Sequence, residues 1–282
     1  MSGEAEKTER AYVYMVRCAG GQLYTGWTND PASRLHAHKS GKGAKCTRAL
    51  RAQRFAYLER CTDKSAALRR EAALKKLTKA QKEALCAEWA EKNLPRLSLA
   101  TRADAAEILD IYNWYVLHHT ATFQVTPSSL PEYEDWVDST RALIPLLLAR
   151  DGDGKLLGYA CAHRYHPREA YDWAVESTIY CAPDARGFGV GHTLYRALLD
   201  ILDGMGYWNV YALVADPNPA SERIHARLGF TCVGREPHTA YKFGWLGLST
   251  WWLPLRRGNE KPEPTHPLTQ EQVEEILGRY QA

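Results

Sequence analysis

The chain has 282 residues, more than a single domain usually has, and its net charge of +3 hides two oppositely charged parts. Residues 1–93 carry 19 Lys+Arg against 10 Asp+Glu, a net charge of +9, whereas residues 94–282 carry 17 against 23, a net charge of −6. We therefore expect a basic module, suited to a polyanion such as nucleic acid, fused to an acidic one, although a solvated lysine-rich helix face would also explain the charge.

Composition argues against several classes of protein. The seven cysteines are scattered without the spacing of a zinc site or a C-x-x-C pair, which indicates a reduced, intracellular protein. The first ten residues are polar and no stretch approaches 18 consecutive apolar residues, so neither secretion nor a membrane partner is indicated. We expect a cytoplasmic protein with a disordered segment at 1–10.

The basic part predicts a small domain over residues 11–93. Two short strands, 11–18 and 23–28, flank a turn at Gly20-Gly21. Asp30 and Pro31 begin a helix that ends near Lys39, before Ser40-Gly-Lys-Gly43. A third strand is predicted at 54–59, followed by helices at 63–77 and 78–91.

The acidic part predicts a longer unit over residues 94–257 that mixes strands and helices. Strands are expected at 97–101, 145–150, 156–163, 173–181 and 208–214 and near Thr231 and Thr250, and helices at 104–117, 130–143, 191–204 and 219–228. The remaining segment, 258–282, contains prolines and a short polar helix at 269–280, which we expect to be a loosely attached appendage. The fold class is α+β with two domains.

A glycine-rich turn, Arg186-Gly-Phe-Gly189-Val-Gly191, connects the strand at 173–181 to a helix. Glycines let a backbone approach a ligand closely, and a helix N-terminus offers free N–H groups to an anion. The spacing differs from the dinucleotide pattern G-x-G-x-x-G and lacks a Walker lysine, which weakens an NAD or ATP interpretation. A phosphate-bearing ligand is therefore expected here, with a simple glycine turn as the alternative.

This turn resembles the R/Q-x-x-G-x-G/A signature of the GNAT family of N-acetyltransferases, and residues 218–230 (NPASERIHARLGF) are similar to the helix that follows in that family. AYDWAVESTIY (170–180) resembles the preceding strand of phosphinothricin-type members. The resemblance implies a mixed sheet flanked by helices and an acetyl-CoA site. The cofactor residues that it implies are Ile179, Arg186, Gly187, Gly189, Val190, Gly191, His192, Asn218 and Ser221.

Acetylation of an amine requires a base, and Glu176 on the strand is the predicted general base, although a solvated carboxylate is the alternative. Backbone N–H groups near 179–181 are expected to stabilise the oxyanion. The phosphinothricin-type subgroup has histidine at the position of His225, which implies that this residue protonates the departing thiolate; a purely structural histidine is the alternative.

The same resemblance suggests where the acceptor, a small-molecule amine, would bind. Tyr112, His119 and Phe123, with Thr120, correspond to the acceptor pocket. Arg168 and Tyr171 correspond to residues associated with an amino-acid substrate, and arginine suits a carboxylate through paired hydrogen bonds. We therefore expect an acceptor of the phosphinothricin or methionine sulfone type.

Residues 11–90 resemble the GIY-YIG nuclease superfamily in its small bacterial form, an α/β sandwich. Tyr12-Val-Tyr14 and Tyr24-Thr-Gly26 match its paired strand motifs, Arg34 and His38 lie one helical turn apart, and Glu71 lies on a later helix. The resemblance implies that Glu71 binds Mg²⁺, that Arg34 stabilises phosphoryl charge, and that Tyr14, Tyr24 and His38 position or deprotonate water. Basic residues at 39, 42, 45, 48, 51 and 54 would follow a nucleic-acid backbone.

Three functions remain open: an N-acetyltransferase fused to a structure-specific DNA endonuclease, an N-acetyltransferase whose first domain only binds nucleic acid, and a cofactor-binding regulator without activity. Glu176 and His225 argue against the third, and Glu71 with Arg34 favours the first. A homodimer is compatible with this sequence, which leaves the oligomeric state open.

Overall fold

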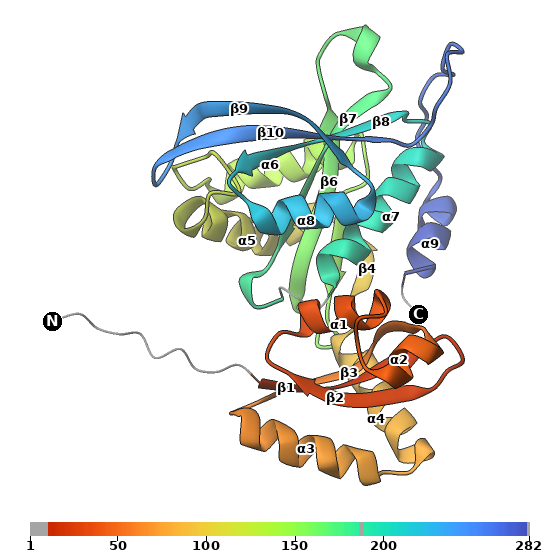
Figure 1. The fold of residues 1–282 in the computed structure, drawn as a ribbon. Helices are drawn as coiled ribbons and strands as arrows, with labels where there is room; N and C mark the ends of the chain where they lie inside the picture. Colours follow the sequence, from red (N-terminus) through yellow and green to blue (C-terminus); the bar gives the residue numbers. More distant parts are fainter. Residues whose placement is uncertain (1–10, 186–188, 281–282) are drawn as a thin grey trace, which may run out of the picture. The chain divides into compact units, whose positions relative to one another are not determined.

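The computed structural model describes residues 11–185 and 189–280, and the chain divides into two compact units, residues 1–94 and 95–282 (Figure 1). Within the described residues, no helix is long and apolar enough to cross a membrane. Each unit has its own sheet and its own buried side chains.

The first unit is built on a three-stranded antiparallel sheet in the order β2-β1-β3. Successive side chains of a strand point to opposite faces, and this alternation separates two cores on β1. Val13 and Met15 pack with Leu74 on one face, whereas Tyr14 and Val16 pack with Leu35 on the other. The elements are β1 (Ala11–Cys18), β2 (Leu23–Thr28), α1 (Pro31–Lys39), α2 (Lys45–Leu50), β3 (Ala52–Cys61), α3 (Lys64–Lys76) and α4 (Lys79–Asn93).

Local signals explain most of these elements. Asp30 caps α1 through its side chain, Asp63 caps α3, and Thr78 forms a capping box with Gln81 at the start of α4. The helix α2 is absent from the sequence prediction. It has six residues, its N-cap is Ala44 without a side-chain bond, and only Thr47 is buried, so neither capping nor periodicity signals it.

The second unit contains a seven-stranded sheet in the order β4-β5-β6-β7-β8-β10-β9, in which only β7 and β8 are parallel. On β7 (Ala174–Cys181), even-numbered residues face α5 (Ala105–His118), since Tyr180 contacts Tyr115. Odd-numbered residues of the strand face α7 (Val190–Gly204), since Ser177 contacts Tyr195. The strands are β4 (Arg96–Leu99), β5 (Leu147–Arg150), β6 (Leu156–Arg164), β7 (Ala174–Cys181), β8 (Asn209–Asp216), β9 (Thr231–Tyr241) and β10 (Trp245–Pro254). The α-helices are α5 (Ala105–His118), α6 (Leu130–Arg141), α7 (Val190–Gly204), α8 (Pro219–Leu228) and α9 (Gln270–Gly278), and three short 3₁₀ helices are η1 (Arg102–Asp104), η2 (Glu169–Tyr171) and η3 (Pro183–Ala185).

The C-terminal segment corrects the expectation of a loose appendage. Val273, Ile276 and Leu277 of α9 are buried in the main core of the second unit, where α9 packs on α7. Tyr280 also donates a hydrogen bond to Asp200 on α7 at 2.5 Å. The polar residues of α9 form only its exposed side, so its composition concealed a continuous apolar face.

Candidate active sites

The two parallel strands of the second unit separate part-way along their length. β7 pairs with β8 at Ala174, Val175 and Glu176, and the last matched pair is Glu176 with Tyr211. Beyond it, β7 continues to pair with β6 as far as Cys181, and β8 continues to pair with β10 as far as Asp216. The strands therefore open into a V between Glu176 and their C-terminal ends.

Backbone N–H groups of β7 face this opening. The carbonyl of Trp173 accepts from Asn209 N, on the β8 side, whereas the carbonyl of Ala174 accepts from Tyr165 N, on the β6 side. Backbone groups alternate sides along a strand, so the N–H groups of Ile179 and Cys181, which lie beyond the last matched pair, face the opening, at the positions expected to stabilise an oxyanion.

The helix α7 begins beside this opening. Gly189, its N-cap, has a left-handed φ of 84°, which favours glycine, and Gly191 lies so close to β7 that an added Cβ would be 3.2 Å from Cys181 Sγ. The first helical bond runs from Thr193 N to Gly189 O, so the N–H groups of 190–192 precede the helical ladder. Val190 is buried and His192 is exposed. Arg186 and Gly187 lie outside the described residues.

The predicted base, Glu176, is half-buried on the face of the sheet that carries Tyr211. Its carboxylate is 3.9 Å from His163 Nε2 on the neighbouring strand β6. Burial raises the pKa of Glu176, and the charge of His163 partly opposes this effect. A carboxylate with a raised pKa can accept a proton from an amine more effectively than an ordinary one.

His225 on α8 is buried, and both of its ring nitrogens contact other groups of the protein. Its side chain is 3% exposed, Nδ1 is 2.8 Å from the carbonyl of Ser221, and Nε2 is 3.0 Å from Tyr195 Oη, which in turn is 2.6 Å from Ser177 Oγ. A carbonyl only accepts, so Nδ1 carries a hydrogen and donates it to Ser221 O. Burial also lowers the pKa of His225. The Nδ1 hydrogen is thus already donated to the main chain and the ring is enclosed by protein groups, which favours the structural alternative.

Asn218 and Ser221 form the start of α8. Asn218 Oδ1 accepts from Ser221 N at 3.2 Å, so this oxygen caps the helix, and the residue is buried. Ile224 of the same helix approaches Gly191, where an added Cβ would be 3.3 Å from its Cδ1. The middle of α8 therefore lies against the beginning of α7.

The predicted acceptor residues fall into two groups. In the first, Tyr112 bonds Thr122 Oγ1 and Gln124 Oε1, and the His119 ring accepts from Ala121 N, so both hold the loop after α5 in place. Phe123 in that loop is exposed. Lys242, which is buried, also donates to the carbonyls of Tyr115 and Thr122.

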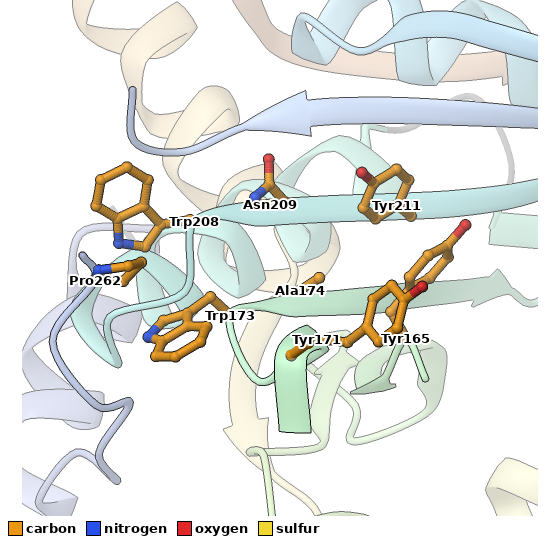
Figure 2. A pocket seen from close by; sticks show the side chains of 9 residues that line it. Tyr165, Tyr171, Trp173, Ala174, Trp208, Asn209, Tyr211 and Pro262 are labelled. Atoms are coloured by element: carbon orange, nitrogen blue, oxygen red, sulfur yellow. The ribbon is translucent and has the colours of Figure 1, made fainter. Parts of the chain in front are cut away.

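The second group is Arg168 and Tyr171, of which Tyr171 lines a cavity of about 260 Å³ on the Glu176 face of the sheet (Figure 2). Figure 2 shows Tyr165, Tyr171 and Tyr211 on one side, Trp173, Trp208 and Pro262 on the other, and Ala174 and Asn209 between them. Tyr165 stacks on Tyr211 with ring centroids 4.2 Å apart. Arg168 is exposed at the N-cap of η2, the short helix that carries Tyr171.

The first unit brings its predicted site residues together. Tyr14 Oη is 2.8 Å from His38 Nε2 and accepts from Arg34 Nε at 3.0 Å. The Tyr24 ring lies 5.3 Å from the His38 ring and 6.4 Å from the Tyr14 ring. Burial raises the pKa of Tyr14, and the hydrogen bond and charge of Arg34 partly oppose this effect. Burial is the main cause that lowers the pKa of His38, and the positive charge of Arg34 lowers it further.

Two glycines make room for this cluster. A Cβ at Gly26 would be 2.5 Å from Tyr14 Oη, and a Cβ at Gly43 would be 2.4 Å from His38 Nδ1. Both distances are shorter than any ordinary contact, so the tyrosine and histidine can adopt these positions only beside glycine.

Glu71 on α3 is the predicted metal ligand. It forms an ion pair of 2.7 Å with Lys75, and its charge acts on Tyr14. The described residues include no group of three or more His, Cys, Asp or Glu side chains placed to hold a metal. One carboxylate fits Mg²⁺ held mainly by water and phosphate, provided that Lys75 releases it. The basic residues Lys39, Lys42, Lys45, Arg48, Arg51 and Arg54 are all exposed.

Three residues of these sites were missed from the sequence. Thr47 contacts His38, and Ser177 and Tyr195 form the network that ends on His225. The sequence has no signal for them, because each contact joins side chains from different elements that meet only in the folded chain.

Comparison with known proteins relates each unit to a family. A family model described as the GIY-YIG catalytic domain matches residues 10–84, and one described as the acetyltransferase (GNAT) family matches residues 108–230. A phosphinothricin N-acetyltransferase of Streptomyces viridochromogenes is 35% identical over 170 residues, which cover 60% of this chain and 90% of the relative. An L-methionine sulfoximine/L-methionine sulfone acetyltransferase of Pseudomonas aeruginosa is 37% identical over 155 residues, covering 54% of this chain and 90% of the relative.

A solved structure agrees as well. The phosphinothricin acetyltransferase of Sinorhizobium meliloti in complex with acetyl-CoA superposes with a TM-score of 0.58 and 33% identity, covering 60% of this chain and 93% of that one. These similarities accompany three features of the structure: the separation of β7 from β8, the glycine at the start of α7, and the cluster of Tyr14, Arg34 and His38. The chain belongs to the GNAT family of N-acetyltransferases, in its phosphinothricin acetyltransferase type, and carries a GIY-YIG domain at residues 10–84.

Proposed function

We propose that the second unit transfers an acetyl group from acetyl-CoA to the amine of a small amino-acid-like substrate. The observation that carries this proposal is the end of β7–β8 pairing at Glu176 and Tyr211, which exposes strand N–H groups beside the start of α7. The N–H groups of residues 190–192 bind the cofactor phosphates, as expected at a helix N-terminus. Gly189 and Gly191 fit this ligand because a side chain at either position would strain or crowd the turn.

The chemistry then follows from the placement of each group. Acetyl-CoA supplies the acetyl group as an activated thioester. Glu176 accepts a proton from the acceptor ammonium, so that the neutral amine attacks the carbonyl carbon. The C–S bond then breaks, and CoA leaves as a thiol after its sulfur takes the second proton of the attacking nitrogen. The N–H groups of Ile179 and Cys181 stabilise the negative oxygen of the tetrahedral state. His225 holds Tyr195 beside Ser177 and thereby fixes the strand next to Glu176.

The acceptor approaches on the face of the sheet that carries Glu176. Ala174, at the floor of the aromatic cavity, is one same-face step from Glu176, roughly 6.5 Å along the strand. An amino acid lying over Tyr171 can therefore place its amine at Glu176, with Arg168 binding its carboxylate. The names of the relatives support an acceptor of the phosphinothricin or methionine sulfone type.

Release of CoA by the purified chain tests this function. We expect turnover with phosphinothricin or methionine sulfone, a fall in kcat/KM of about 10²- to 10⁴-fold in Glu176→Gln, and no change in the control Asp153→Asn, an exposed carboxylate in the β5–β6 turn. Arg168→Gln should raise KM. Turnover with a protein N-terminus but with none of these amino acids would overturn the proposed acceptor.

We also propose that the first unit cleaves branched or flap DNA with Mg²⁺. Support comes from the cluster in which Tyr14 bonds both His38 and Arg34, with Glu71 acting on the same tyrosine. Tyr14 positions or deprotonates the attacking water and passes its own proton to His38, while Arg34 stabilises the phosphoryl charge. The exposed lysines and arginines around α2 bind the nucleic-acid backbone.

Cleavage of branched, flap and duplex DNA, with and without Mg²⁺, tests this second function. Glu71→Gln should abolish cleavage, whereas Glu88→Gln, an exposed carboxylate on α4, should not change it. Equal cleavage by the wild type and Glu71→Gln would assign the signal to a contaminant. Salt-sensitive binding without cleavage would favour the alternative, a non-cleaving nucleic-acid-binding module.

A further inference from the structure

Thr47 is a fully buried polar residue that contacts the predicted nuclease cluster without belonging to any of its motifs. Its side chain is 0% exposed, and Oγ1 is 2.7 Å from His38 Nδ1. The same oxygen lies 2.8 Å from the carbonyl of Ala44, at the start of α2. A buried hydroxyl that reaches a histidine ring determines which hydrogens that ring can carry.

A continuous chain of hydrogen bonds connects Arg34 to the main chain through this threonine. Arg34 Nε bonds Tyr14 Oη at 3.0 Å, Tyr14 Oη bonds His38 Nε2 at 2.8 Å, His38 Nδ1 bonds Thr47 Oγ1, and Thr47 Oγ1 bonds Ala44 O. The two ends have fixed roles, because a guanidinium only donates and a carbonyl only accepts.

These fixed ends determine the direction of every bond between them. If Thr47 donates to Ala44 O, it accepts from His38 Nδ1–H, and the bare Nε2 then accepts the hydroxyl hydrogen of Tyr14. In the reverse direction Tyr14 Oη would receive hydrogens from both Arg34 and His38, and its own hydrogen would need another acceptor at a residue that is 0% exposed. An unpaired buried donor is destabilising because it has lost its hydrogen bond to water, so the forward direction is favoured.

We propose that Thr47 is a positioning residue of the first unit, which holds the proton of His38 on Nδ1 so that Nε2 can receive the proton of Tyr14. This inference rests on the proposed nuclease function, in which Tyr14 must give up its hydrogen when it takes one from water. Thr47 acts only through His38, and nothing in the motif that contains Tyr14, Tyr24 and Arg34 requires it.

Substitutions at this position separate the hydroxyl from the shape of the side chain. Thr47→Val keeps nearly the same volume but offers no acceptor to Nδ1–H, so the His38 proton should move to Nε2 and Tyr14 should lose its acceptor. Thr47→Ser keeps the hydroxyl and should restore the wild-type arrangement. Thr62→Val replaces an exposed threonine of the same unit and serves as the control.

Long-range proton–nitrogen NMR of the ¹⁵N-histidine-labelled full chain, with His38→Asn to assign the signal, measures the tautomer directly. We expect protonated Nδ1 and bare Nε2 in the wild type, Thr47→Ser and Thr62→Val, and protonated Nε2 in Thr47→Val. A wild-type ring protonated on Nε2 overturns the proposal, as does a Thr47→Val ring that keeps its proton on Nδ1. The wild-type and Thr47→Ser spectra still decide the question should Thr47→Val fail to fold.

DNA cleavage supplies the functional readout. We expect Thr47→Val to lower kcat by about 10²-fold, the lower end of what proton transfer contributes, with KM unchanged, and Thr47→Ser to remain within a few-fold of the wild type. Unchanged cleavage by a Thr47→Val protein whose tautomer has switched would overturn the positioning role. Absence of cleavage by the wild type would refute the nuclease function, while the NMR result would still decide whether Thr47 sets the tautomer.

Discussion

Replacing Leu277 with alanine tests whether α9 is part of the acetyltransferase core. Leu277 is 3% exposed and packs, with Val273 and Ile276, into the core cluster that contains much of α7. Removing a buried leucine side chain costs about 2–5 kcal/mol, because apolar contacts are lost and a cavity remains. A loss of about 3 kcal/mol is a large share of the 5–15 kcal/mol that stabilises a typical domain.

The expected result is a roughly 10²-fold increase in the unfolded population of the second unit. Urea unfolding of the full chain, followed by hydrogen-exchange mass spectrometry, separates the two units, because peptides from α7 report on the second and peptides from β1 report on the first. Glu274→Ala, an exposed change on the same helix, should stay within about 0.5 kcal/mol of the wild type. If Leu277→Ala were equally harmless, α9 would be an appendage and the packing argument would fail.

Three further predictions concern the two sites. The kcat/KM of the acetyltransferase should fall on acidification with an apparent pKa above that of an ordinary glutamate, because burial raises the pKa of Glu176. A Glu176→Gln variant that kept the same fall in kcat/KM at low pH would contradict the assignment of Glu176 as the base. Gly26→Ala should abolish any DNA cleavage and lower the melting temperature, because its Cβ would displace the Tyr14 hydroxyl. Gly20→Ala is the control, because its Cβ meets only the exposed end of the Gln22 side chain. Equal melting temperatures for the two variants would refute this reasoning. Burial lowers the pKa of His225, so the contribution of the neutral ring to stability should be complete above the unfolded-state pKa of about 6.5 and be lost as the pH falls below it. The difference in urea midpoint between the wild type and His225→Asn should therefore shrink on acidification. A difference that grows would show that the sign is wrong.

Several features could be predicted from the amino-acid sequence by itself. Apolar periodicity, caps such as Asp30 and Asp63, and glycine positions are local properties, and they were sufficient to place most helices and strands within a few residues. The cluster of Tyr14, Arg34 and His38 was expected from the resemblance of the tyrosine motifs to the GIY-YIG superfamily. Spacing alone places Arg34 and His38 on one face of a helix, and their contacts with Tyr14 form only in the folded chain.

Other features were decided only by tertiary structure. The separation of β7 from β8 depends on the residue at which pairing between these two strands ends. The burial of α9 depends on the apolar face of α7 that packs against it. The ring of His225 is engaged by Tyr195 from another helix, and Thr47 reaches His38 from a helix too short to be seen in the sequence. Each of these contacts joins elements that are separate in the chain, and a hydrogen bond to a buried side chain forms only when both elements are in place. The sequence alone therefore indicated most of the side chains proposed for both sites, whereas the folded chain determined which of these side chains contact one another and which further residues join them.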